Sequence, residues 1–190
     1  MPPHADLLLE ERILKAAQRL WRVRGERGLT LRAVAREAGS TTPTVYKRFR
    51  NKQAILTTLA VRIRAQLNEH LFGAKSIEDV GRRYLQFAEQ HPNEYQLLMH
   101  SWGDIFHPGQ PRPGRAWLMT QFANRFGGTP EEYSRTVYGL ILLAHGASTL
   151  LSIPADEVSR QEVRSNFLGV ADAIIRHPQL FMSRSNDPSH

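Results

Sequence analysis

The chain of 190 residues has no cysteine, which excludes disulfide bonds, thiolate metal sites and cysteine nucleophiles. It also has no apolar stretch of the roughly 18 residues that a membrane-spanning helix requires. Residues 1–11 lack the basic start and the apolar run of a secretory signal peptide. We therefore expect a cytoplasmic protein that is stabilised by side-chain packing and has no membrane partner.

Patterns that indicate catalysis are absent as well. The sequence has no Gly-rich phosphate loop, no Ser-His-Asp order and no pair of carboxylates with catalytic spacing. His100, Asp104 and His107 follow the i, i+4, i+7 spacing of metal ligands on one helical face. However, the Pro- and Gly-rich segment 107–114 predicts the end of that helix, and no fourth ligand is evident. We expect no enzymatic activity, no cofactor and no metal.

Apolar residues instead recur at the helical period of 3.6 along most of the chain, and no segment alternates as a strand does. We predict an all-α fold of about nine helices. Their expected ranges are 6–23, 31–38, 42–49, 51–71, 77–91, 95–102, a segment that ends near 126, 130–151 and 159–177.

Capping residues mark the boundaries of the short helices near the N-terminus. Thr30 is suited to begin one helix, and Gly39 to follow its end. Thr42 is expected to cap the next helix, with Pro43 at its first position, and Asn51 to cap the long helix that follows.

Basic residues are concentrated in the same part of the chain. Residues 1–64 hold 14 Lys and Arg against 5 Asp and Glu, a formal net charge of +9, whereas residues 65–190 carry −2. A basic end of this kind attracts polyanions such as nucleic acid, although basic side chains also simply solvate an exposed helix.

Two short helices joined by residues 39–41 have the dimensions of a helix-turn-helix, whose second helix enters the major groove of DNA. Val45 and Phe49 are expected to face inward. Thr42 and Thr44 carry hydroxyl and methyl groups that suit contacts with base edges. The exposed residues Tyr46, Lys47 and Arg48 suit phosphates.

The run from Thr30 to Leu56, TLRAVAREAGSTTPTVYKRFRNKQAIL, resembles the N-terminal segment of the tetracycline-repressor (TetR) family. RILKAAQRLW, residues 12–21, precedes it and is similar as well. The resemblance covers about the first third of the chain. This chain departs from the family at two positions. The family commonly has a small residue or Gly where this chain has Pro43, and a Val before the Ser or Thr where this chain has Ser40. The shared spacing comprises Thr30, Ala35, Ala38, Gly39, Tyr46, Phe49, Asn51 and Lys52.

This resemblance implies roles for individual residues and a division of the chain. Arg32, Thr42 and Thr44 would approach bases, and Thr30, Tyr46, Arg48 and Lys52 would approach phosphates. A three-helix DNA-binding domain of residues 1–52 would be joined by a connecting helix to a helical effector-binding and dimerisation domain of residues 53–190. The segments FAEQHPNEYQLLM and GLILLAHGASTLL resemble the subgroup named for a Trp-His-Gly motif, with Ala144 in place of the Trp.

Aromatic and apolar residues of the second part either line an effector cavity between helices or form ordinary core. His145 either forms a hydrogen bond within the core or orients a polar group of the effector. The candidates for the effector pocket are Tyr84, Phe87, Tyr95, Met99, Trp102, Trp117, Phe122, Tyr138 and His145. The candidates for a four-helix dimer interface are Leu140, Leu143, Leu150, Val163, Phe167, Val170 and Ile174.

The leading hypothesis is a homodimeric repressor that binds a pseudo-palindromic, double-stranded DNA operator and is released by a small-molecule effector of unknown identity. An activator and a DNA-binding regulator without an effector are alternatives of the same class. A helical enzyme or small-molecule carrier with an incidental basic end is the alternative of another class, and it predicts no discrete operator.

Overall fold

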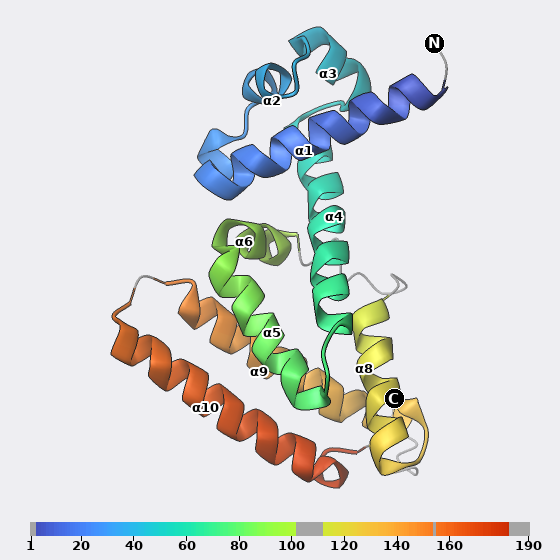
Figure 1. The fold of residues 1–190 in the computed structure, drawn as a ribbon, viewed down its shortest axis with the longest axis vertical. Coiled ribbons are helices and arrows are strands. Elements are labelled where there is room, and N and C mark those ends of the chain that lie inside the picture. Colours follow the sequence, from blue (N-terminus) through green and yellow to red (C-terminus); the bar gives the residue numbers. More distant parts are fainter. Residues whose placement is uncertain (1–2, 102–111, 154, 183–190) are drawn as a thin grey trace, which may run out of the picture. The chain divides into compact units, whose positions relative to one another are not determined.

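The computed structural model describes residues 3–101, 112–153 and 155–182, so that Trp102, Asp104 and His107 lie outside the described residues. Within those ranges the chain forms nine α-helices and two short 3-10 turns, with no strand (Figure 1). The predicted all-α fold is confirmed. None of the helices in this part of the chain has the length and apolar character that crossing a membrane would need.

The chain divides into two compact units that differ from the expected division after residue 52. The first unit comprises residues 1–66 and 91–110, and the second comprises residues 67–90 and 111–190. Helix α4 (Lys52–Phe72) therefore begins in the first unit and ends in the second, and α6 (Pro92–His100) belongs to the first unit.

In the first unit, α1 (Pro3–Gly28) packs against α2 (Leu31–Glu37), and α2 packs against α3 (Thr42–Arg48). Helix α1 was expected to end near Val23, but it bends at Gly25 (φ 55°, ψ −147°) and continues to Gly28. Only glycine adopts that backbone conformation readily, because it has no Cβ. The core contains Ile13, Ala16, Ala17, Trp21, Val34, Ala35, Val45, Phe49, Ile55, Leu59 and Ile63.

Helix α6 joins the first unit through polar contacts with α1. The Glu94 carboxylate, 1% exposed, accepts hydrogen bonds from Gln18 Nε2 (2.7 Å) and from the guanidinium of Arg22 (3.0 and 3.1 Å). The Trp21 indole donates to the carbonyl oxygen of Asn93, and Asn93 Nδ2 donates to that of Arg22 (2.8 Å). A buried carboxylate is tolerated here because donors from α1 satisfy it.

The second unit is a helical bundle around one apolar core. It consists of α5 (Ile77–Gln90), α8 (Pro113–Phe126), α9 (Ser134–Leu151) and α10 (Glu157–Arg176), with 3-10 turns at Pro130–Tyr133 and Pro178–Leu180. Helices α5, α9 and α10 pack against one another, and α8 packs against α9. The core includes Ile77, Val80, Leu85, Leu118, Met119, Phe122, Tyr133, Val137, Leu140, Ala144, Ala147, Leu151, Phe167, Ala171 and Ile175.

Two helix starts in this unit differ from the predictions. The 3-10 turn at Pro130–Tyr133 precedes α9, so that the α-helix itself begins four residues later than expected. Helix α10 begins before Ser159, because Asp156 is its N-cap and accepts a 2.9 Å hydrogen bond from the Ser159 N–H. The predicted start of α5 is confirmed, since the Asp79 N–H donates to Ser76 Oγ (3.2 Å).

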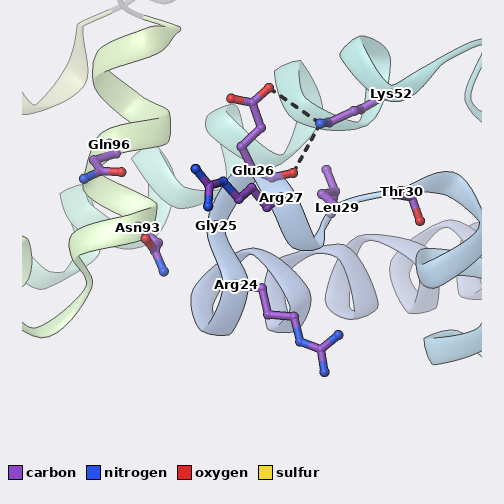
Figure 2. Close-up of a pocket in the computed structure, with 9 residues that line it drawn as sticks. All are labelled: Arg24, Gly25, Glu26, Arg27, Leu29, Thr30, Lys52, Asn93 and Gln96. Atoms are coloured by element: carbon purple, nitrogen blue, oxygen red, sulfur yellow. Dashed lines mark hydrogen bonds and ion pairs between the residues drawn. The ribbon is translucent and has the colours of Figure 1, made fainter.

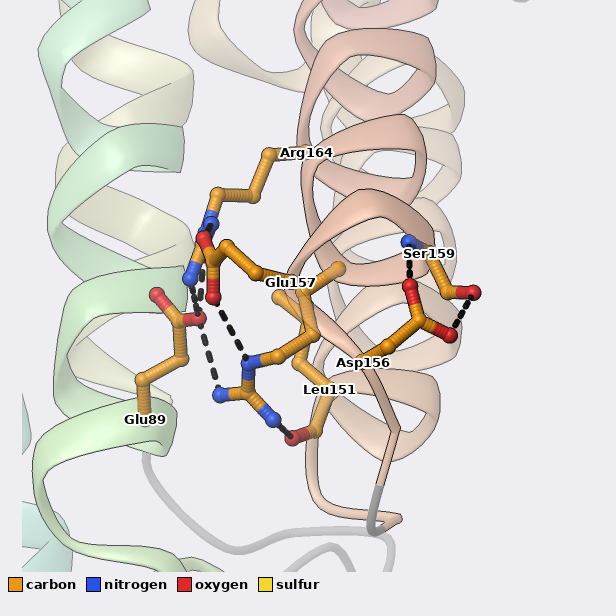
Figure 3. A network of polar contacts seen from close by, with 7 residues as sticks. Glu89, Leu151, Asp156, Glu157, Ser159 and Arg164 are labelled. Carbon is orange, nitrogen blue, oxygen red and sulfur yellow. Dashed lines mark hydrogen bonds and ion pairs between the residues drawn. The ribbon is translucent and has the colours of Figure 1, made fainter.

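An ion-pair network joins α5 to α10 within this unit (Figure 3). Glu89 Oε1 accepts from the guanidinium groups of Arg164 (2.5 Å) and Arg160 (3.2 Å). Arg160 also donates to the Leu151 carbonyl oxygen (2.9 Å) at the last turn of α9, where the helix leaves carbonyls without partners. Glu89 and Glu157 raise the pKa of Arg164 through hydrogen bonds, which keeps the charged form dominant.

Candidate nucleic-acid interface

The turn between α2 and α3 is built by local hydrogen bonds. Thr30 caps α2, since its side chain accepts from the Ala33 N–H (3.1 Å). At the other end the Ser40 N–H donates to the Ala35 carbonyl oxygen (2.9 Å), and the Gly39 N–H donates to that of Arg36 (3.2 Å). This pair of bonds is a Schellman motif with Gly39 in the left-handed conformation (φ 60°). The predicted cap and the predicted glycine are confirmed.

The start of α3 requires a correction, because Thr41 rather than Thr42 is its N-cap. Thr41 is extended (φ −103°, ψ 151°), and its Oγ1 accepts from the Thr44 N–H (3.3 Å). Pro43 therefore occupies the second helical position. The hydroxyls of Thr41 and Thr44 lie 2.8 Å apart, so that Thr41 also holds the side chain of Thr44.

Helix α3 has one buried and one exposed face. Val45 (0% exposed) and Phe49 (5%) are buried, as predicted from their spacing. On the other face Tyr46 is 54% exposed, and Lys47 is exposed as well. Arg32 is exposed on α2. The helix-turn-helix thus offers side chains of the kind that contact DNA on one side while it packs through the other.

Two basic residues predicted to contact phosphates pair with acidic residues of α1. Arg48 Nε lies 3.0 Å from Glu10 Oε2, and its side chain is only 24% exposed, so it is less open to solvent than expected. Lys52 Nζ donates to the Glu26 carbonyl oxygen (3.3 Å) and lies 3.6 Å from Glu26 Oε1. These acidic partners were missed because they lie 26 and 38 residues away in sequence.

The Lys52–Glu26 pair lies at an open recess of about 600 Å³ within the first unit (Figure 2). The recess includes Arg24 and Arg27, which lie beyond the expected end of the first helix at residue 23 and were not among the predicted site residues. The lining residues are Arg24, Gly25, Glu26, Arg27, Leu29, Thr30, Lys52, Asn93 and Gln96.

The candidates for the effector pocket fall into separate groups. Tyr95 (1% exposed) and Met99 lie on α6, in the first unit. Tyr138 is 48% exposed on α9 and does not point into the core of its own chain. Phe122 is fully buried and stacks on Tyr133 with ring centroids 5.5 Å apart, as a core residue does. Trp102 lies outside the described residues.

The structure brings Tyr84 of α5 and His145 of α9 together. The Tyr84 hydroxyl lies 2.7 Å from His145 Nδ1, and the two rings meet edge to face. Burial lowers the pKa of His145 from 6.5 to about 4, so that the imidazole is neutral near pH 7 and Nδ1 is able to accept a hydrogen bond from the phenol O–H. Phe87 and Trp117 also belong to this unit, and Trp117 packs against Phe72 with centroids 5.4 Å apart.

The candidates for the dimer interface are not all at the surface. Leu140 (9% exposed) and Phe167 (3%) pack in the core of their own unit and leave little side-chain surface for a partner. Leu143, Val163 and Ile174 are partly buried against the same core. Leu150 (54%) and Val170 (48%) are exposed.

Comparisons with known proteins agree with this geometry. Residues 13–59 match the sequence model of a family described as bacterial regulatory proteins, tetR family. A TetR structure from Acinetobacter baumannii AYE is similar, with a TM-score of 0.67 and 16% identity over 90% of this chain and 97% of that one. A TetR transcriptional regulator from Streptomyces coelicolor also has a TM-score of 0.67, with 18% identity over 91% and 98%.

A protein of unknown function from Rhodococcus sp. RHA1 has a TM-score of 0.62 and 25% identity, over 88% of this chain and 94% of that one. No curated protein matches the chain. The structural likeness shows the fold, and the match of residues 13–59 covers the helix-turn-helix itself. Residues 13–59 therefore form a DNA-binding domain of the tetR family of bacterial regulatory proteins, and the protein is a DNA-binding transcriptional regulator.

Proposed function

We propose that the protein is a repressor that binds a pseudo-palindromic operator as a homodimer in the cytoplasm and is released by a small-molecule effector. The main support is α3, which buries Val45 and Phe49 and exposes Tyr46 and Lys47 beside a capped turn. The second helix of a helix-turn-helix is the one that enters the major groove. DNA binding is assigned to residues 1–52, and effector binding to the residues that follow.

Base contacts are assigned to Arg32, Thr42 and Thr44. A guanidinium makes paired hydrogen bonds with guanine, and a threonine offers a hydroxyl and a methyl group to base edges. The hydrogen bond between Thr41 and Thr44 supports this role, because it limits the rotamers of the Thr44 side chain before DNA is bound.

Phosphate contacts are assigned to residues around the helix-turn-helix. They position the protein on the duplex without reading sequence, and they make the affinity depend on salt. The residues are Thr30, Tyr46, Lys47, Arg48 and Lys52.

We place the effector in the second unit, beside Tyr84 and His145 and near Phe87 and Trp117. The neutral imidazole and the phenol are polar groups beside the apolar core of this unit, and small-molecule sites commonly combine an apolar lining with a few polar groups. Repression is relieved only if the effector binds the DNA-incompetent state more tightly. Helix α4 continues from the first unit into the second, so a conformational change that the effector causes in the second unit would reach the first unit through α4.

A second copy of the chain is the partner that we assign to the exposed apolar side of α9 and α10. Tyr138 (48% exposed) and Leu142 (53%) lie four residues apart and share one face of α9, and Val170 (48%) is exposed on α10. Exposed apolar surface of this extent indicates an interface, and a two-fold dimer covers the same surface on both chains. Two recognition helices then match two half-sites.

The test is a mobility shift with the DNA upstream of the protein's own gene, combined with footprinting. A discrete complex with a two-fold symmetric footprint is expected, and a dimer is expected in sedimentation. Reporter expression with and without the gene separates repression from activation. If the protein formed no discrete complex with any promoter fragment at low ionic strength, the proposal would be wrong.

A further inference from the structure

Two cationic side chains that the proposed function assigns to DNA phosphates form ion pairs with acidic side chains of α1. Lys52 Nζ donates to the Glu26 carbonyl oxygen (3.3 Å) and lies 3.6 Å from its carboxylate. Arg48 lies 3.0 Å from the carboxylate of Glu10. In both pairs a carboxylate oxygen takes the place beside the cation that a phosphate oxygen would take.

The surroundings of Lys52 leave room for a phosphate group. Lys52, Thr30 and Arg27 line the recess of about 600 Å³, and Glu26 lies in the same wall (Figure 2). Thr30 Oγ1 accepts from the Ala33 N–H, which leaves its own proton available to an anion. A phosphate that approaches Lys52 therefore enters a recess that has room for it, but also meets the negative charge of Glu26.

We propose that Glu26, and in the same way Glu10, competes intramolecularly with the DNA backbone for these cations. Each carboxylate lowers the sequence-independent part of the affinity, because contact with a phosphate requires the ion pair to open or leaves two negative charges close together. The base contacts of α3 then contribute a larger share of binding. This inference rests on the proposed function, since it requires Lys52 and Arg48 to meet phosphates.

The exposure of the pair sets the size of the effect. The side chains of Glu26 and Lys52 are 69% and 38% exposed, so that water and salt screen their attraction and the pair opens readily. Glu26 therefore weakens DNA binding without preventing it. Its removal is expected to tighten binding about two- to fivefold at low ionic strength, and less as salt is added.

Glu37 supplies a matched control within the same unit. Its carboxylate pairs with Arg19 at 2.9 Å, and the two side chains are 40% and 58% exposed. Arg19 is not among the residues assigned to phosphate. Glu37→Gln therefore removes the same charge from the same unit without releasing a phosphate-binding cation.

The experiment measures binding of the full chain to a duplex of random sequence by fluorescence anisotropy, over a salt series from about 50 to about 200 mM. We expect Glu26→Gln to bind more tightly than wild type and to show a steeper dependence of log affinity on log salt. Glu37→Gln should change both quantities less. The gain should disappear when Lys52 is absent, so that the double variant Glu26→Gln/Lys52→Ala binds no more tightly than Lys52→Ala. Glu10→Gln should likewise tighten binding and steepen the salt dependence through Arg48. Thermal melting checks that each variant is folded.

The inference is overturned if Glu26→Gln matches Glu37→Gln, if its gain persists without Lys52, or if it binds DNA more weakly than wild type. The last result would mean that Glu26 holds Lys52 in position for DNA. A Lys52→Ala variant that keeps the wild-type salt dependence would instead remove the phosphate role of Lys52. Failure of the wild type to bind any duplex would overturn the proposed function itself.

Discussion

The Tyr84 hydroxyl lies 2.7 Å from Nδ1 of His145, and the two rings meet at a centroid distance of 5.2 Å and an angle of 85°. The contact joins α5 to α9 inside the second unit. The imidazole of His145 is neutral and shielded from water at this contact, so the stability of the unit should depend on pH in the acidic range.

Stability is expected to fall between about pH 6.5 and pH 4 because of His145. Burial lowers the pKa of its imidazole from 6.5 to about 4. In that window the unfolded chain binds a proton that the folded chain does not, so the free energy of unfolding decreases as the pH falls. The shift corresponds to at most about 3 kcal/mol. Urea denaturation across the window should show His145→Gln losing this part of the pH dependence, and identical pH profiles would contradict the expectation.

Glu89 is expected to stabilise the second unit more than Glu157 does, although both accept from Arg164. Glu89 is 19% exposed and also accepts from Arg160, whereas Glu157 is 74% exposed. Glu89→Gln should lower the free energy of unfolding by about 1–2 kcal/mol, since it weakens charge-assisted hydrogen bonds away from solvent. Glu157→Gln should lower it by about 0.5 kcal/mol or less. Equal losses in chemical denaturation would argue against the burial effect.

Glu94→Ala should loosen α6 from α1. The change leaves Gln18, 7% exposed, without its carboxylate partner, and a loss of about 2 kcal/mol or more is expected. Gln96→Ala on the same helix is the control, because its side chain is exposed, and it should change stability by less than about 0.5 kcal/mol. Hydrogen exchange should accelerate in α1 and α6 of the first variant alone. Unchanged protection there would show that the polar contacts do not hold α6.

Gly146→Leu should separate the proposed dimer without unfolding the chain. Gly146 is exposed on α9, and an added Cβ meets no atom within 4 Å in its own chain. At a two-fold interface the larger side chain would overpack, raising the dissociation constant roughly tenfold or more. Asn124→Leu, at an exposed position on α8, is the control. A sedimentation profile of Gly146→Leu equal to that of wild type would place the interface elsewhere.

Thr44 and Lys52 should affect DNA binding differently. Thr44→Ala is expected to lose roughly 1 kcal/mol or more of discrimination between operator and random DNA, because a base contact disappears. Lys52→Ala should weaken binding to both and reduce the slope of log affinity against log salt by about one unit. Salt titrations on both duplexes measure the two quantities. If Lys52→Ala lost discrimination and kept the wild-type slope, Lys52 would contact a base rather than a phosphate.

Local sequence patterns were sufficient to predict most of the secondary structure around α3. The Thr30 oxygen begins α2 and the left-handed Gly39 follows its end, through bonds that reach only three to five residues along the chain. The spacing of Val45 and Phe49 predicted the buried face for the same reason. The N-cap of α3 was wrongly assigned to Thr42 instead of Thr41, because Pro43 suits either of the first two helical positions.

The remaining features depend on contacts between residues that lie far apart in the sequence, so local patterns did not predict them. The apolar period of α9 did not identify its inward side, because the helix is apolar nearly all round, and only packing separates Leu140 from Tyr138 and Leu142. Glu94 lies 76 residues from Gln18, too far for any local pattern to pair them. The short-range capping patterns and apolar periods of the chain are thus sufficient to predict an all-α protein with a helix-turn-helix. Its two units, their buried polar contacts and the acidic partners of Lys52 and Arg48 arise only when the helices pack.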